Sequence, residues 1–229
     1  MPILSHPAHV LLIMPLVLLS GAAAADEASW EQVAQTDDGV AVYMRAPSGT
    51  TVKEVRASLR IAAPPRIVLD AACDPKSFRK SLKYVERQRY YWIGDPDVWF
   101  TYQLLDYPVV TKRDYVIRYE RTLDPAKGIY RLSWSTSAEK GPPSREDAIR
   151  VTLATGGIDV VPEGGGERSL LEFRLLADPG GSIPGWVINI ANRLSLPDIV
   201  REIRDAAIRR ARQCAKGDCR HWDAVGHAY

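Results

Sequence analysis

Alternating apolar and polar positions recur along the chain between residues 40 and 177. Tyr130, Leu132 and Trp134, for example, alternate with polar side chains. Because successive side chains of a strand point to opposite faces, this pattern predicts strands with one apolar and one solvated face. Short turns rich in Gly, Pro and Asp separate these segments, which predicts an antiparallel meander. The expected strands are 40–45, 51–61, 84–93, 98–105, 114–122, 128–137, 149–154, 158–161 and 170–177.

Three further segments have helical spacing or composition: 27–35, 66–72 and 184–214. In the last segment the apolar residues form a rough stripe, which predicts one face buried against the sheet. Its first half is apolar nearly all round, its second half is rich in arginine, and Pro197 is expected to kink or interrupt it. A half-apolar sheet covered by one long helix is an α+β arrangement. The expected stripe consists of Trp186, Val187, Ile190, Leu194, Ile199, Ile203 and Ala207.

The N-terminal segment has the pattern of an export signal. An apolar run from Val10 to Ser20 is followed by Gly21 and four alanines, which predicts a signal peptide over residues 1–25 that is cleaved near Ala25. The run is too short for a typical membrane span. No Lys or Arg precedes it, so an uncleaved anchor stays as an alternative. We expect a periplasmic or secreted protein with one domain over 26–214 and a tail over 215–229.

The net charge and the cysteines limit the classes of function and of site that this sequence can have. The 229 residues carry a formal net charge of +2, which gives no basis for nucleic-acid binding. Cys214 and Cys219 flank a short turn-prone loop, and export makes a disulfide between them the favoured interpretation. Cys73 is then a buried free thiol. A zinc site formed by the two tail cysteines with His221 and His227 is the alternative, but the spacing fits no usual zinc pattern, so no metal site is predicted.

Two junctions and the last helix together resemble the START domain, the lipid-transfer domain related to the steroidogenic acute regulatory protein. The first junction is 106–116, which contains Pro108 and the run Arg113-Asp114-Tyr115-Val116; the second is 178–186, the turn into the last helix. The resemblance implies a helix-grip fold, in which a curved antiparallel sheet wraps around the long C-terminal helix. It also implies an internal tunnel for one sterol, phospholipid or similar lipid, no cofactor, transient membrane contact and a monomer.

The tunnel needs apolar walls, because a lipid leaving a bilayer forfeits about 0.8 kcal/mol for each CH₂ group exposed to water. Where some sterol-binding members of the family have a charged pair, this sequence has Phe100 and Tyr119, which favours a more neutral tunnel. Arg113 and Asp114 could form a catalytic pair or bind a lipid head group, but the favoured interpretation is that they fix the turn by pairing with the backbone or with each other. The residues expected to line the tunnel are Phe100, Tyr102, Leu104, Tyr115, Ile117, Tyr119, Tyr130, Leu132, Trp134, Phe173, Leu175, Trp186, Ile190 and Leu194.

A lipid carrier is therefore the function that the sequence favours. Helix-grip relatives that act as cyclases or hydrolases make an enzyme the first alternative. All four histidines lie in the signal region or the tail, and no nucleophile motif lies on the sheet, so no catalytic residue is predicted. A lipid sensor within an envelope complex is the second alternative.

Overall fold

A computed structural model describes residues 29–78, 84–92, 94–108, 110–219 and 221–222. The strands are β1 (Glu31–Gln35), β2 (Ala41–Arg45), β3 (Glu54–Ile61), β4 (Val85–Trp92), β5 (Val98–Leu105), β6 (Lys112–Asp124), β7 (Ile129–Thr136), β8 (Ala148–Arg150), β9 (Leu153–Glu163) and β10 (Arg168–Asp178). The helices are α1 (Pro65–Cys73) and α2 (Gly185–Ala215), and short 3₁₀ turns lie at η1 (Pro75–Phe78), η2 (Pro125–Lys127) and η3 (Gly164–Gly166). The predicted export signal lies outside the described residues.

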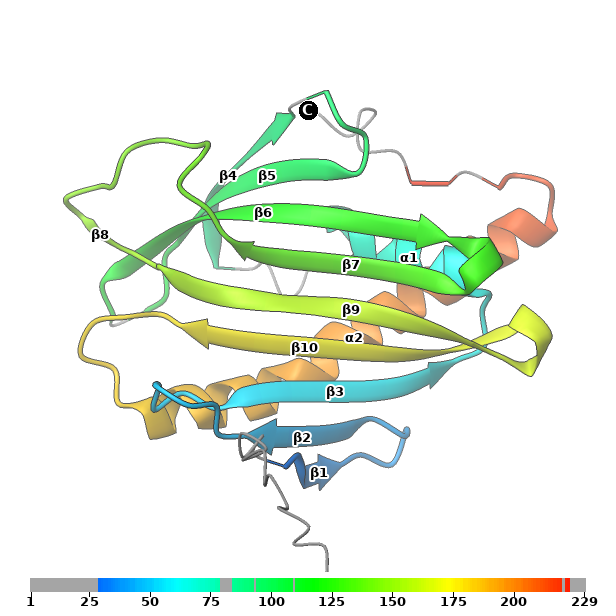
Figure 1. Cartoon of the computed structure of the whole chain (residues 1–229), viewed down its shortest axis with the longest axis horizontal. Helices are drawn as coiled ribbons and strands as arrows, with labels where there is room; N and C mark the ends of the chain where they lie inside the picture. Colours follow the sequence, from blue (N-terminus) through cyan, green and yellow to red (C-terminus); the bar gives the residue numbers. More distant parts are fainter. Residues whose placement is uncertain (1–28, 79–83, 93, 109, 220, 223–229) are drawn as a thin grey trace, which may run out of the picture.

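All the strands belong to one curved sheet in the described part of the chain, and both helices lie against the same face of it (Figure 1). The strand order is β1-β2-β3-β10-β9-β7-β6-β5-β4. The first strands join the last through β3 and β10, where Ala57 lies opposite Phe173. The predicted helix-grip fold is confirmed. Two pairings depart from the predicted meander, because β3 pairs with β10 and not with β4, and β8 runs parallel to the start of β6.

The core lies between β3, β10, α1 and the second half of α2. The inward residues of β3 are Val55, Ala57, Leu59 and Ile61, and each is at most 3% exposed. α2 contributes Leu196, Val200, Ile203 and Ala207, and α1 contributes Val68, Leu69 and Ala71. Pro65 fits the first turn of α1 because a backbone N–H at that position would have no acceptor within the helix, and proline has no N–H. This packing fixes α2 against the sheet.

The helix predicted over 27–35 is wrong where the structure describes it, because residues 31–35 form the edge strand β1. β1 pairs with β2 in antiparallel register. The ring of Trp30, just before it, lies 4.6 Å from the guanidinium of Arg45 and 4.9 Å from that of Arg56. These cation–π contacts tie the strand to the sheet, and a helix at this place would forgo both them and the ladder.

The predicted break between the strands 149–154 and 158–161 is also wrong, since β9 is continuous through Gly156 and Gly157. Gly156 is needed there because a Cβ atom would lie 2.6 Å from the indole of Trp134 and 2.2 Å from the carbonyl oxygen of Arg174. The glycine therefore makes room for a ring and does not end the strand. Likewise, Pro197 does not interrupt α2, which continues as one helix on both sides of it.

Candidate functional site

Aromatic rings form a ladder across the inner face of the sheet, the face that carries α2. The ring centroids of Trp99 and Tyr119 are 5.3 Å apart, those of Tyr119 and Trp134 are 6.2 Å apart, and those of Trp134 and Phe173 are 5.3 Å apart. The register explains the ladder, because Tyr119 lies directly opposite both Trp99 and Trp134, and opposed residues share a face. The first ring, Trp99, was missed by the sequence interpretation.

Eight of the residues predicted to line a tunnel share this inner face. Leu132 and Phe173 are buried in the main core, and Ile117 lies in a second apolar cluster with Val151 and Ala154. The strand register places the others beside them. The structure thus brings together Tyr115, Ile117, Tyr119, Tyr130, Leu132, Trp134, Phe173 and Leu175.

The predicted inner positions of Phe100, Tyr102 and Leu104 are wrong. These side chains point to the outer face of β5, where they pack with Val98 and Val116 in a separate cluster. Partly buried Tyr91 and Ala148 cover this cluster. All but one residue of β5 are buried, so both faces of the strand are apolar and alternation carried no information about which face is inner.

The predicted inward positions of Trp186, Ile190 and Leu194 are wrong as well. Their exposed fractions are 67%, 50% and 65%. The buried side of α2 consists of Ile188, Leu196 and Val200 together with Ile203 and Ala207, the two residues of the predicted stripe that are buried. Asn189 fixes this orientation, because its Oδ1 accepts a hydrogen bond of 2.9 Å from the backbone N–H of Lys53. The exposed residues are four apart, so they form a second apolar stripe on the side of the helix that faces solvent.

Neutral hydroxyl groups accompany the inner rings. Burial raises the pKa of Tyr119 to about 12, although the nearby Thr101 hydroxyl opposes the shift, and burial also raises the pKa of Tyr90 and Tyr115. All three phenols therefore stay protonated near neutral pH and can donate a hydrogen bond. The Thr101 hydroxyl is buried near Tyr119 and makes no hydrogen bond of good geometry within the described residues. Orphaned polar atoms of this kind suit a ligand that carries a polar group.

Arg113 and Asp114 are held by different partners and not by each other. The Asp114 carboxylate, fully buried, accepts two hydrogen bonds of 2.9 Å from Arg150, one to each oxygen. Arg113 points to the opposite face, where its guanidinium donates to the backbone carbonyls of Thr111 and Gly180. The backbone pairing that the sequence predicted is observed for Arg113 only.

The end of the chain packs onto the inner ladder. A disulfide joins Cys214 to Cys219, the pair that the sequence favours, and occupies the two thiolates that a zinc ion would need. Beyond it, His221 Nδ1 lies 2.7 Å from the buried carboxylate of Asp70. Trp222 is 3% exposed, and its ring centroid lies 4.8 Å from that of Trp99. The tail therefore closes one end of the ladder, which nothing in the sequence pattern indicated.

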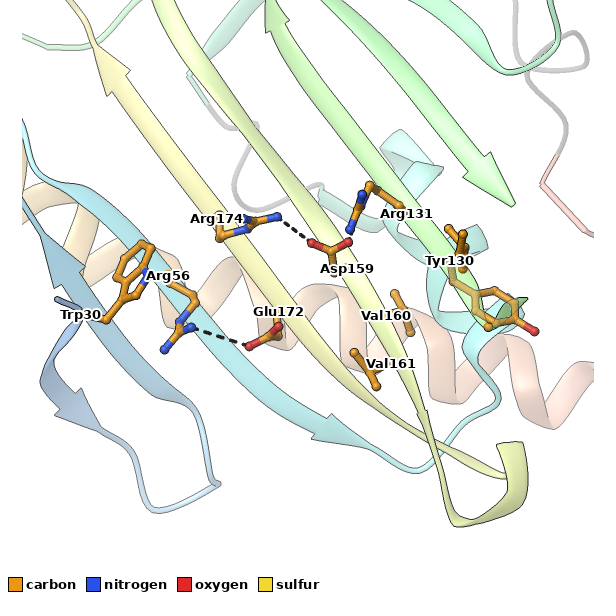
Figure 2. Close-up of a pocket in the computed structure, with 11 residues that line it drawn as sticks. Trp30, Arg56, Tyr130, Arg131, Asp159, Val160, Val161, Glu172 and Arg174 are labelled. Atoms are coloured by element: carbon orange, nitrogen blue, oxygen red, sulfur yellow. Dashed lines mark hydrogen bonds and ion pairs between the residues drawn. The ribbon is translucent and has the colours of Figure 1, made fainter. Parts of the chain in front are cut away.

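A hollow of about 350 Å³ lies on the outer face of the sheet, away from the ladder (Figure 2). Charged side chains dominate it, and they are already paired. Asp159 bridges Arg131 and Arg174, the second at 2.7 Å, and Glu172 lies 3.9 Å from Arg56. This hollow does not suit an apolar ligand, so the inner face is the candidate site.

The profile of the START domain matches residues 17–214 of this sequence. The chain belongs to the START domain family. The START match ends at Cys214, so the disulfide loop and Trp222 follow the matched region.

Relatives of this START protein agree with its fold. It is similar to the STAR-related lipid transfer protein (fragment 25–204) of Xanthomonas axonopodis, at 21% identity and a TM-score of 0.66, over 78% of this chain and 98% of that one. It is also similar to human STARD10, at 17% identity and a TM-score of 0.68, over 82% and 76% of the two chains. The uncharacterised protein PA1579 of Pseudomonas aeruginosa is 29% identical over 161 residues, which cover 69% of this chain and 77% of that protein.

Proposed function

We propose that this protein binds one lipid between the inner face of its sheet and α2, and carries or presents it between membranes without changing it chemically. The aromatic ladder from Trp99 to Phe173 is the observation that carries the proposal. It supplies apolar walls with a few neutral hydroxyl groups, which is the composition of a site for an apolar ligand. Membership of a family that binds lipids and other hydrophobic ligands supports it.

Transfer through such a site is nearly balanced in free energy. An acyl chain that leaves a bilayer loses about 0.8 kcal/mol per CH₂ group in water and recovers most of it against apolar walls. The protein therefore lowers the barrier to exchange by keeping the chain out of water.

Ala154 tests whether the inner face holds a ligand. It lies next to Ile117 and Val151 at one end of the ladder and has a small side chain. We expect Ala154→Phe to take up ligand space, so that the purified protein carries less lipid by mass spectrometry and moves less lipid between vesicles while it unfolds at nearly the wild-type temperature. Ala138→Phe, at an exposed position, is the matched control.

Several outcomes would contradict the proposal. An interior already filled with side chains would make Ala154→Phe destabilising by about 1–3 kcal/mol, since overpacking forces strain. The proposal would also be contradicted if the wild-type protein neither retained nor transferred lipid. Chemical conversion of the lipid during incubation would instead indicate an enzyme.

We propose further that the exposed stripe Trp186, Ile190 and Leu194 contacts the membrane surface. Between residues 179 and 197 the only charged side chain is Arg193, so no carboxylate there repels an anionic bilayer. Tryptophan is favoured at the water–lipid interface because one edge is apolar and the other polar. Among the helices of the described chain, none has both the length and the apolar character to span a bilayer. We propose a superficial and reversible contact.

Vesicle sedimentation tests this contact. The triple substitution of Trp186, Ile190 and Leu194 to serine is expected to reduce binding to anionic vesicles at least severalfold and to slow lipid transfer, while lipid already bound stays bound. Val161→Ser is the matched control, because Val161 is 44% exposed but lies on β9. Equal vesicle binding by the triple variant and the wild type would refute the contact.

Export to the periplasm or the medium is the location we propose. The Val10–Ser20 run and the Cys214–Cys219 disulfide support it, since such bonds persist in oxidising compartments. Fractionation of cells that produce the full chain, with mass measurement of the mature N-terminus, tests both export and cleavage.

A further inference from the structure

Arg113 is a buried cation with no anion beside it. It is 4% exposed and begins the inner face of β6, two residues before Tyr115. Its Nη atoms donate to the carbonyl oxygens of Thr111 and Gly180, the second at 3.3 Å, and its Nε is buried without a partner. Within the described residues no carboxylate oxygen lies within 4.0 Å of this guanidinium.

The acidic residues near it in the sequence are engaged elsewhere. Asp114 on the outer face is paired with Arg150, Asp106 lies 3.4 Å from Lys112, and Asp178 accepts from the backbone N–H of Gly180 at 2.8 Å. Other largely buried arginines of this protein have an acidic partner, as Arg121 has in Asp97 at 2.6 Å. A buried charge is costly unless it is paired, so the missing anion at Arg113 needs an explanation.

A second feature at the same end of the sheet also favours an anion. The loop from β10 to α2 lies against the guanidinium, since a Cβ atom on Gly181 would be 3.4 Å from Nη2 of Arg113. That loop leads into α2, whose first turn has neither a side-chain cap nor an acidic residue. The N-terminal end of a helix carries partial positive charge. The guanidinium of Arg113 and the N-terminal end of α2 therefore both place positive charge beside the β10–α2 loop. Residues 179–197 contain no carboxylate that could balance this charge.

We propose that Arg113 binds the anionic group of the lipid, a carboxylate or a phosphate, and so selects an acidic lipid. This inference rests on the proposed function, since it assigns one end of the ligand in the same interior. The apolar part would lie along Ile117 and Tyr119 towards the aromatic ladder. From Arg113 to Tyr119 the strand extends about 20 Å, enough for a long acyl chain.

Binding of matched lipids tests the charge. Oleate, methyl oleate and oleoyl lysophosphatidate share one acyl chain but present a carboxylate, a neutral ester or a phosphate, and each is titrated below its critical micelle concentration into delipidated protein. Wild type is expected to bind at least one of the two acids about tenfold or more tightly than the ester, the usual gain from a charge-assisted hydrogen bond. Which acid gains more identifies the source of the anion.

Two arginine variants locate the effect. Arg113→Gln is expected to lose the preference for the acids while it keeps the affinity for methyl oleate. Arg118→Gln, on the outer face of the same strand and paired with Glu120, is the matched control and should keep the preference. Equal wild-type affinity for acids and ester, or an acid preference that survives Arg113→Gln, would overturn the inference and leave the proposed function intact. Failure of wild type to bind any of the three lipids would also overturn the inference, whereas the proposed function falls only if the purified protein neither retains nor transfers lipid.

A measurement on the wild-type protein covers the case in which Arg113→Gln does not fold. The ¹⁵N-resolved Nε–H resonance of Arg113, assigned by its loss in Arg113→Lys, should shift when an acidic lipid is added and stay in place with methyl oleate. An unmoved resonance at saturating acid would overturn the inference.

Discussion

Burial of charge is the strongest effect at the scale of single residues. The outer face of β6 holds Asp114 fully buried, and both of its oxygens are satisfied by Arg150. Arg150 also donates to the carbonyl oxygens of Pro142 and Pro143. One ion pair thus fixes the loop before β8 to the start of β6.

Arg150→Met is expected to destabilise the fold by about 3–5 kcal/mol, because it leaves the Asp114 carboxylate buried without a counter-charge. Urea unfolding at neutral pH measures the loss. Arg145→Met breaks the more exposed pair with Asp147 and should destabilise the fold far less, because water screens an exposed ion pair. Similar losses for the two variants would show that the Asp114 pair has no special role.

At the residue scale, some positions of the candidate site could be predicted from the sequence and others could not. On β6 and β7, polar residues alternate with Tyr119, Leu132 and Trp134, so the inner face was readable from the period of two. On β5 both faces are apolar, since Tyr91 of β4 and Ala148 of β8 cover the outer one, and the inner face was wrongly assigned to Phe100 instead of Trp99. The sequence singled out Arg113 as part of the Arg113–Asp114 junction but not its lack of an anionic partner, because an unpaired charge is visible only in the folded chain.

At the scale of elements, α2 is held by contacts that differ between its halves. The first half is fixed by Asn189 on the backbone of Lys53. The second half is fixed by Arg201 and Arg204, which both donate to Asp38 in the turn between β1 and β2. The sequence predicted the bounds of this helix closely, but in its first half two apolar stripes compete, and only tertiary contacts decide which one is buried.

Asp38 makes the anchoring of α2 dependent on pH. Hydrogen bonds from Arg201, then from Thr36 and Arg204, hold the pKa of this carboxyl well below its usual range. A lowered pKa gives stabilisation that is complete above the unfolded value of about 3.9 and is lost as the pH falls below it.

We therefore expect Asp38→Asn to unfold more easily than wild type at pH 7, and the difference to shrink as the pH is lowered from about 5 towards 2. Thermal unfolding across this range measures it. Asp37→Asn, in the same turn but outside these hydrogen bonds, should follow the wild-type curve. A constant gap between Asp38→Asn and wild type at every pH would show that the carboxylate charge has no part in the anchoring.

At the scale of the whole molecule, the tail beyond α2 completes the interior. The backbone carbonyl of Trp222 accepts a hydrogen bond of 3.2 Å from Arg121, whose guanidinium carbon also lies 5.1 Å from the Trp222 ring. The disulfide turns the chain back after Cys214, which brings Trp222 to the ladder. A segment that the sequence presented as an ordinary tail is part of the core.

Trp222→Ala is expected to lower the free energy of unfolding by about 3–5 kcal/mol through the lost packing on Trp99. Replacement of Cys214 and Cys219 by serine should also destabilise wild type, but much less in the Trp222→Ala background, because the disulfide and the ring act through the same contact. A double-mutant cycle by chemical denaturation measures the coupling. Additive losses would mean that the disulfide does not position Trp222.

The pairing of β3 with β10 has a consequence for how the chain acquires its shape. Ala57 and Phe173 meet across the sheet although they are far apart in sequence, so closing this seam requires a large loop to form first. A nascent chain can make the β1–β3 and β4–β7 hairpins early, but the edge of β3 that faces away from β2 has no neighbour until β10 has been synthesised. Assembly should accordingly be slow and late, and a truncated chain that stops before residue 168 would expose the edge of β3 as a template for aggregation.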